Sequence, residues 1–171
     1  MAGGALVDLC VRWLHIAGVI VWLGHNWSNV VRRPRYRRAL PDDAPRETPE
    51  EALLAASRRE HGVFRYASVV VLGTGLTLLA RRGVLREALT LQGPTVVLGV
   101  GVWLGVAMAC NLWLVLWPHQ RKVLGFVPAP LEERLRCTRV TFLSSRVNSV
   151  LSLPTLFCMV VGSHDPWALH W

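Results

Sequence analysis

Four apolar segments, each close to the length that a bilayer requires, constrain the fold of this chain more than any other feature. They cover residues 6–30, 63–80, 96–117 and 140–162. A helix needs ~20 apolar residues to cross the hydrocarbon core of a membrane. Hydrophobic residues make up 52% of the 171 residues, so the bilayer is the expected solvent. We therefore predict an all-α integral membrane protein, a four-helix bundle formed by one four-span domain of residues 1–171.

The basic residues are distributed unevenly between the connections of this bundle. Thirteen of the 19 Lys and Arg residues lie in 31–59 and 118–139, whereas Arg12, Arg81, Arg82 and Arg86 belong to the opposite side. The positive-inside rule places the richer connections in the cytoplasm. It predicts a multi-pass membrane protein with both termini facing outward and an Arg-rich cytoplasmic loop at 31–48. Membrane orientation and contact with lipid headgroups then account for the net charge of +8. No nucleic-acid recognition motif is present.

Two helices are expected to begin before they enter the membrane. Thr48-Pro49-Glu50-Glu51 has the form of a capping box, which predicts a helix from about Pro49 through Ala80. Pro130-Leu131-Glu132-Glu133 predicts a second such start, with a helix continuing to about Val161. Helices 2 and 4 of the bundle would therefore extend on the cytoplasmic side.

Histidines within or beside the spans are candidate cofactor ligands. At 100° per residue, His15, Trp22 and Asn26 form one stripe on the first helix, with His25 on its flank. His15 lies towards the outer leaflet, whereas His25, His61 and His119 lie near the cytoplasmic boundary. Histidines on facing helices can hold haem iron, so each of these histidines is a candidate ligand, and one cofactor is not expected to take both His15 and His61. The alternative is that these side chains cap helices or hydrogen-bond neighbouring residues.

The fourth segment carries an intramembrane cation. Arg146 and Asn148 lie early in that span, and Pro154 is expected to kink it. Three interpretations of Arg146 remain open: it extends to the interface, pairs with a carboxylate, or binds a cofactor propionate or an anionic substrate.

The third segment ends in a polar cluster. Residues 111–122 read NLWLVLWPHQRK, and Asn111, Pro118 and Lys122 share a stripe within about 40° on a regular helix. We expect Asn111, Lys122, Arg146 and Asn148 to line an anionic pocket near the cytoplasmic side and to be the candidate catalytic residues.

These motifs resemble a known family. NLWLVLWPHQRKVLG (111–125) and SSRVNSVLSLPTLFCMVVGSH (144–164), with RWLHIAGVIVWLG (12–24) and HGVFRYASVVVLGTG (61–75), resemble the urate oxidase N-terminal domain. That domain is the membrane part of bacterial urate hydroxylase. The resemblance implies a membrane oxidoreductase that hydroxylates urate at a ring carbon and passes electrons to a fused cytochrome c domain. The present sequence has no C-x-x-C-H motif and no such domain, which leaves the electron acceptor unidentified.

The preferred hypothesis is a redox protein embedded in the bacterial inner membrane, with periplasmic termini, that binds haem b or a similar cofactor and exchanges electrons with a separate partner. His15 and His61 are the candidate metal ligands that the resemblance shares, in separate sites or with one alone binding. Trp22, His25 and Arg146 join them as candidate cofactor-binding residues. One alternative is a non-catalytic subunit of a larger respiratory or photosynthetic complex. A second, based on the likeness of the first helix to small membrane protoporphyrinogen oxidases, is an enzyme of that type. A transporter or channel is disfavoured, since no pair of broken helices is evident.

Overall fold

The described part of the chain folds entirely into helices. The computed structural model describes residues 2–32, 35 and 62–163. Its elements are, in order, α1 (Ala2–Arg32), α3 (Val63–Arg81), α4 (Leu85–Thr90), the 3-10 turn η1 (Gly93–Thr95), α5 (Val96–Cys110), the π-helix η2 (Asn111–Leu116), α6 (Trp117–Val123) and α7 (Leu131–Ser163). The all-α prediction is confirmed for these residues.

Three of these helices are long and apolar enough to cross a membrane. They are Gly3–Arg32, Gly93–Val123 and Leu131–Ser163, and each has at least 30 residues. At 1.5 Å per residue, 30 residues span ~45 Å, more than the ~30 Å of a hydrocarbon core. The predicted second span, 63–80, is also helical, but α3 has 19 residues, includes Arg65 and Arg81, and is not one of the three.

Of the two predicted helix extensions, one is confirmed and the other lies outside the described residues. α7 begins at Leu131 and ends at Ser163, so a helix starting after Pro130 is confirmed, and it continues through Pro154. The helix expected from about Pro49 lies outside the described residues up to position 61. Gly62 has φ 70, in the left-handed region, so α3 begins at Val63 and is not the continuation of an α-helix through Gly62. Of the loop 31–48, Val31 and Arg32 belong to α1, and Arg35 is the one other described residue.

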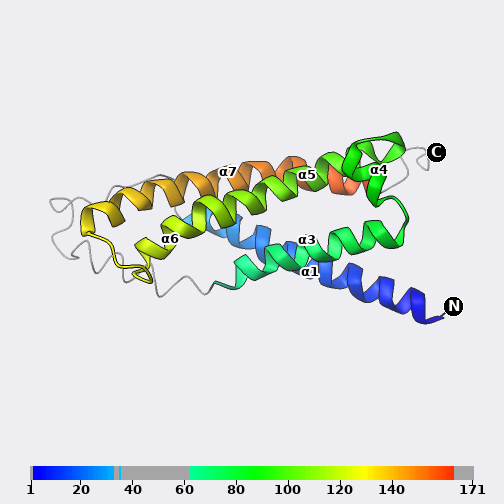
Figure 1. The fold of residues 1–171 in the computed structure, drawn as a ribbon, viewed down its shortest axis with the longest axis horizontal. Coiled ribbons are helices and arrows are strands. Elements are labelled where there is room, and N and C mark those ends of the chain that lie inside the picture. The colour runs from blue at the N-terminus through cyan, green and yellow to red at the C-terminus, as the bar shows by residue number, and fades with distance from the viewer. Residues whose placement is uncertain (1, 33–34, 36–61, 164–171) are drawn as a thin grey trace.

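The long helices lie side by side and alternate in direction (Figure 1). One end, here called the α6 end, contains α6, the C-terminal turns of α1 and the first turns of α3 and α7. The opposite end, the α4 end, contains α4, the first turns of α1 and the last turns of α7. At the α4 end Arg81 donates from Nε to the carboxylate of Asp8 and from Nη2 to the carbonyl of Gly4 at 3.1 Å, which joins α3 to α1.

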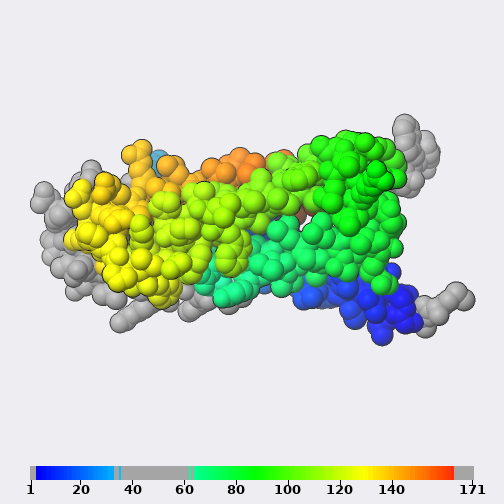
Figure 2. Space-filling view, in the orientation of Figure 1, coloured from blue at the N-terminus to red at the C-terminus, as the bar shows by residue number. Residues whose placement is uncertain are grey.

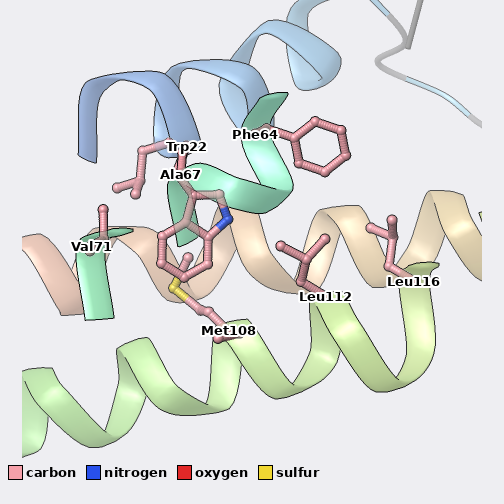
Figure 3. Close-up of a cluster of buried hydrophobic side chains, with 9 residues drawn as sticks. Trp22, Phe64, Ala67, Val71, Met108, Leu112 and Leu116 are labelled. Atoms are coloured by element: carbon pink, nitrogen blue, oxygen red, sulfur yellow. The ribbon is translucent and has the colours of Figure 1, made fainter. Parts of the chain in front are cut away.

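The main core lies where α1, α3 and α5–η2 meet. Figure 3 shows the Trp22 indole reaching from α1 toward Met108 of α5, with Ala67 and Val71 of α3 beside it. Trp22 is 2% exposed, and Met108 is fully buried. Residues every three or four positions on each helix meet here, which is the contact that an apolar helical stripe produces.

A second cluster fixes the α4 end. Leu79, Ala88, Leu98 and Val102 are buried together there. A Cβ on Gly99 would lie 2.1 Å from the carbonyl oxygen of Ala88, so α4 can approach α5 this closely only at a glycine.

Large apolar side chains remain exposed along the outside of the helices. On α1 they include Leu6, Trp13 and Ile20, which are 62%, 69% and 66% exposed, and on α7 they include Val150 and Phe157. In the space-filling view the first turns of α1 project beyond the other helices near the α4 end (Figure 2). This much exposed apolar surface is what a helix presents to lipid or to another membrane protein.

Candidate functional site

The segment that precedes Pro118 is a π-helix. The N–H of Trp117 donates to the carbonyl of Leu112, five residues earlier, rather than to residue 113. Proline has no N–H and its ring collides with the carbonyl four residues before it, here that of Leu114, and a wider turn relieves this conflict. The Nδ1 of His119 lies 2.7 Å from the carbonyl oxygen of Val115. His119 is therefore engaged with its own helix.

The π-helix also corrects one prediction. The stripe of Asn111, Pro118 and Lys122 was placed at 100° per residue, which holds only for an unbroken α-helix. A π segment contains about one additional residue, which displaces the faces on its two sides by ~100°. Asn111 and Lys122 consequently have different surroundings.

Asn111 and Asn148 meet between η2 and α7. The Nδ2 of Asn111 donates to Asn148 Oδ1 at 2.8 Å and to the carbonyl of Ser144 at 2.9 Å, and its Oδ1 accepts from Ser144 Oγ at 2.8 Å. Asn148 is fully buried and donates to the carbonyl of Met108 at 3.1 Å. The predicted pair is therefore brought together, with its amide donors already engaged by protein acceptors. This arrangement joins two helices, as polar side chains do inside membranes.

Lys122 and Arg146 do not extend this cluster into the expected anionic pocket. Lys122 Nζ lies 2.6 Å from Glu133 Oε1, and both side chains are 37% exposed. Arg146 donates to the carbonyl of Asn29 on α1 at 3.4 Å, and its guanidinium carbon lies 4.6 Å from the ring centroid of Phe142. Because Arg146 and Asn148 are two residues apart, their side chains leave α7 in directions ~160° apart.

Two tryptophans donate to buried serines on other helices. Trp113 Nε1 donates to Ser68 Oγ at 3.1 Å, and Trp27 Nε1 donates to Ser152 Oγ at 3.1 Å. Ser68 and Ser152 are fully buried. These residues were not predicted to be part of a site, although small polar residues within apolar segments are a recognised signal of helix contacts.

His15 is oriented by α3. Its Nδ1 lies 3.0 Å from the carbonyl oxygen of Val71 and 3.0 Å from Thr74 Oγ1. A carbonyl can only accept, so the bond to Val71 requires the proton on Nδ1 and leaves a lone pair on Nε2. A Cβ on Gly75 would lie 3.1 Å from His15 Cε1, so this glycine provides the space for the ring.

The other members of the predicted stripe point into the helix assembly. Trp22 and Asn26 are 2% and 4% exposed. Trp22 Nε1 and Asn26 Nδ2 find no acceptor in the described residues. Polar atoms of this kind are commonly satisfied by a bound water or ligand.

His25 lies at the α6 end. Its ring stacks on Phe64 with centroids 4.0 Å apart and an interplanar angle of 3°. Its Nε2 lies 3.0 Å from Asn29 Nδ2, an amide that can only donate, so Nε2 acts as the acceptor. His61, the second predicted iron ligand, lies outside the described residues, as do His164 and His170.

A small cleft opens at the α6 end, between the start of α3 and α6. Its volume is about 120 Å³, and its lining includes Gly62, Phe64, Arg65, Trp117, Gln120 and Phe126. The guanidinium carbon of Arg65 lies 3.2 Å from the ring centroid of Trp117. Arg65 was not predicted to be a site residue, because the 52 positions between it and Trp117 gave no reason to pair the two.

The described residues contain no group of three or more His, Cys, Asp or Glu that could hold a metal ion.

Fold and site together define an all-helical protein with helices able to cross a membrane, joined internally by polar side chains. The comparisons with known proteins add no relative: no family model, curated protein or solved structure matches this chain.

Proposed function

We propose that this chain is a membrane-embedded redox protein, related to the membrane domain of urate hydroxylase, in which His15 holds a haem b. Electrons would pass to or from a separate partner protein. In this proposal α3 is the second of four spans, the Arg-rich connections face the cytoplasm of a bacterial cell, and both termini are periplasmic.

The observation that carries the proposal is the hydrogen bond between His15 Nδ1 and the carbonyl of Val71. Metal-ligating histidines almost always donate their second ring nitrogen to a carbonyl or carboxylate, which fixes the tautomer and the ring orientation. His15 has this arrangement, and its Nε2 lone pair is the atom that would bind iron. Thr74 supports the same nitrogen, and Gly75 leaves room for the ring.

The chemistry that a haem would supply here is the transfer of one electron at a time. The chain's own contribution is to hold the imidazole at a fixed angle and to keep Nε2 unprotonated. Within a bilayer the apolar side chains of α1 and α3 would keep water from this region, which is one of the factors that set the potential of a haem.

The inclusion of α3 among the spans rests on its contacts. Its last residue, Arg81, pairs with Asp8, and Val71 in its middle would lie 2.8 Å from a Cβ on Gly18. α3 therefore lies along α1, a helix that is long and apolar enough to cross a membrane. Pairing of Arg81 with a carboxylate lowers the cost of a charge near the membrane.

The test is the reduced-minus-oxidised absorbance spectrum of the purified full chain, with the His15→Leu variant beside it. A Soret band that is lost in His15→Leu and retained in His119→Leu supports the proposal. His119 is a suitable control because it lies on a candidate span and its Nδ1 is bonded to its own helix. No Soret band in the wild-type protein, or a band that survives His15→Leu, contradicts it.

A second candidate is a non-catalytic subunit of a larger membrane complex, and the exposed face of α1 favours it. Leu6, Trp13 and Ile20 together offer a large exposed apolar surface on this helix. Isolation in mild detergent distinguishes the two candidates. A partner that is lost in Trp13→Ala but retained in Phe157→Ala, an equally exposed aromatic on α7, would favour the subunit hypothesis.

A further inference from the structure

The cleft at the α6 end has features of a binding site that the proposed redox function does not use. It is walled by the aromatic rings of Phe64, Trp117 and Phe126 and has one cationic side chain, Arg65. Its volume of about 120 Å³ accommodates a group of a few heavy atoms rather than a whole cofactor.

Arg65 is held in position, and no described residue neutralises its charge. Its guanidinium lies on the face of Trp117, and its Nε lies 3.4 Å from the carbonyl oxygen of Gly62. A Cβ on Gly62 would lie 2.7 Å from Arg65 Nη2, and the φ of 70 there also favours glycine. No carboxylate within the described ranges forms an ion pair with Arg65. A fixed guanidinium with free N–H groups is suited to an anionic oxygen, in particular that of a phosphate.

Gln120 supplies the second observation. Its side chain is 8% exposed and lines the cleft, and its Oε1 is buried without a donor from the described part of the chain. A buried acceptor without a partner costs free energy, so a ligand with an O–H group would be favoured at this position. The cleft thus offers donors for an anion and an acceptor for a hydroxyl.

Exposed basic residues lie on α6, which lines the cleft, and on α7, which packs against α6. They are Arg121 on α6 and Arg136 and Arg139 on α7. Tryptophan and arginine at the end of an apolar helix are typical of the headgroup level of a membrane, and basic residues there attract anionic lipids.

We propose that the cleft of Arg65, Trp117 and Gln120 binds a phosphoglycerol group, with the phosphate on the Arg65 guanidinium and a glycerol hydroxyl donating to Gln120 Oε1. The group can come from the headgroup of phosphatidylglycerol or from a water-soluble glycerol phosphate. This site lies at the α6 end and is independent of the haem proposed at His15.

The experiment is native mass spectrometry of the full chain in detergent, with phosphatidylglycerol or phosphatidylcholine of identical acyl chains added. We expect one phosphatidylglycerol to be retained per chain in preference to phosphatidylcholine. Arg65→Gln should weaken this binding by about tenfold or more, since hydrogen bonds to charged groups are the stronger kind. Arg139→Gln, which removes the same charge from an exposed site on α7, should change it by less than about twofold, as expected for a screened charge.

Gln120→Leu keeps the net charge and tests the hydroxyl contact. It should reduce the preference for phosphatidylglycerol over phosphatidic acid, which lacks the glycerol headgroup. This variant also keeps the proposal testable if Arg65→Gln does not fold. Competition by sn-glycerol 3-phosphate assigns the site to the soluble ester, and lack of competition assigns it to the lipid. Equal losses in Arg65→Gln and Arg139→Gln, or an unchanged lipid preference in Gln120→Leu, would overturn the proposal.

Discussion

The side-chain amide of Asn111 donates to the amide oxygen of Asn148 at 2.8 Å, linking the start of the π-helix to the centre of α7. Both residues were selected in the sequence as candidate catalytic groups. Each is also bonded to a backbone carbonyl, Asn111 to that of Ser144 and Asn148 to that of Met108. The geometry favours a role in joining the helices, and a role in binding substrate stays a prediction.

Replacement of Asn148 should therefore destabilise the protein. Asn148→Ala removes the side-chain donor to the Met108 carbonyl and leaves one N–H of the Asn111 amide without its acceptor in a fully buried position. A loss of ~1–2 kcal/mol is expected, because interhelical hydrogen bonds in membranes are modest in net value. The measurement is the apparent Tm in detergent. Val147→Ala, at an exposed neighbouring position, is the control, and equal shifts in both variants would contradict the assignment.

Removal of one residue from the π-helix should be tolerated when Pro118 is replaced at the same time. Deletion of Leu114, which is 72% exposed, together with Pro118→Ala converts the wide turn to an α-helical one, avoids the collision of the proline ring with a carbonyl four residues earlier, and keeps the relative faces of α5 and α6. Deletion of Val100 in the middle of α5 rotates one part of that helix by ~100° against its contacts. Thermal stability of the two deletion variants decides the matter. The idea fails if deletion of Val100 is the milder change.

Two glycines on α3 offer a matched test of the His15 site. A Cβ on Gly75 would lie 3.1 Å from the His15 ring, whereas a Cβ on Gly73 meets nothing within 4 Å. Gly75→Val should displace the imidazole and reduce haem occupancy or shift the Soret band, because the ligand angle changes. Gly73→Val should leave the spectrum unaltered. Identical spectra for both variants would argue against a ligand role of His15.

Neutralisation of Glu133 should have a small effect. The Lys122–Glu133 pair joins α6 to the first turn of α7, but both side chains are 37% exposed and solvent screens their charges. Glu133→Gln should lower the apparent Tm less than Asn148→Ala does, and added salt should diminish the difference from wild type. A larger effect than that of Asn148→Ala would show that this pair is shielded from solvent.

The sides of the membrane on which the two termini lie report whether three or four helices cross it. If α3 crosses the membrane, the N- and C-terminal ends lie on the same side, and if three helices cross, they lie on opposite sides. Reporter fusions that are active in one compartment, placed at each terminus, distinguish the two topologies. Opposite locations of the termini would exclude α3 as a span.

The three helices that are long and apolar enough to cross a membrane could be read from the sequence alone, since an apolar run at 1.5 Å per residue is a local property. The start of α7 after Pro130 was likewise readable from Pro and the acidic residues that follow it. The partners of the polar residues could not be read from the sequence, because these contacts depend on how helices distant in the chain are rotated against one another. The π-helix before Pro118 changes that rotation by about one residue, which separates Lys122 from Asn111 and Asn148. Only the tertiary structure, in which α3 lies against α1 and α6, decided that His15 faces the carbonyl of Val71 and that Arg65 lies on Trp117.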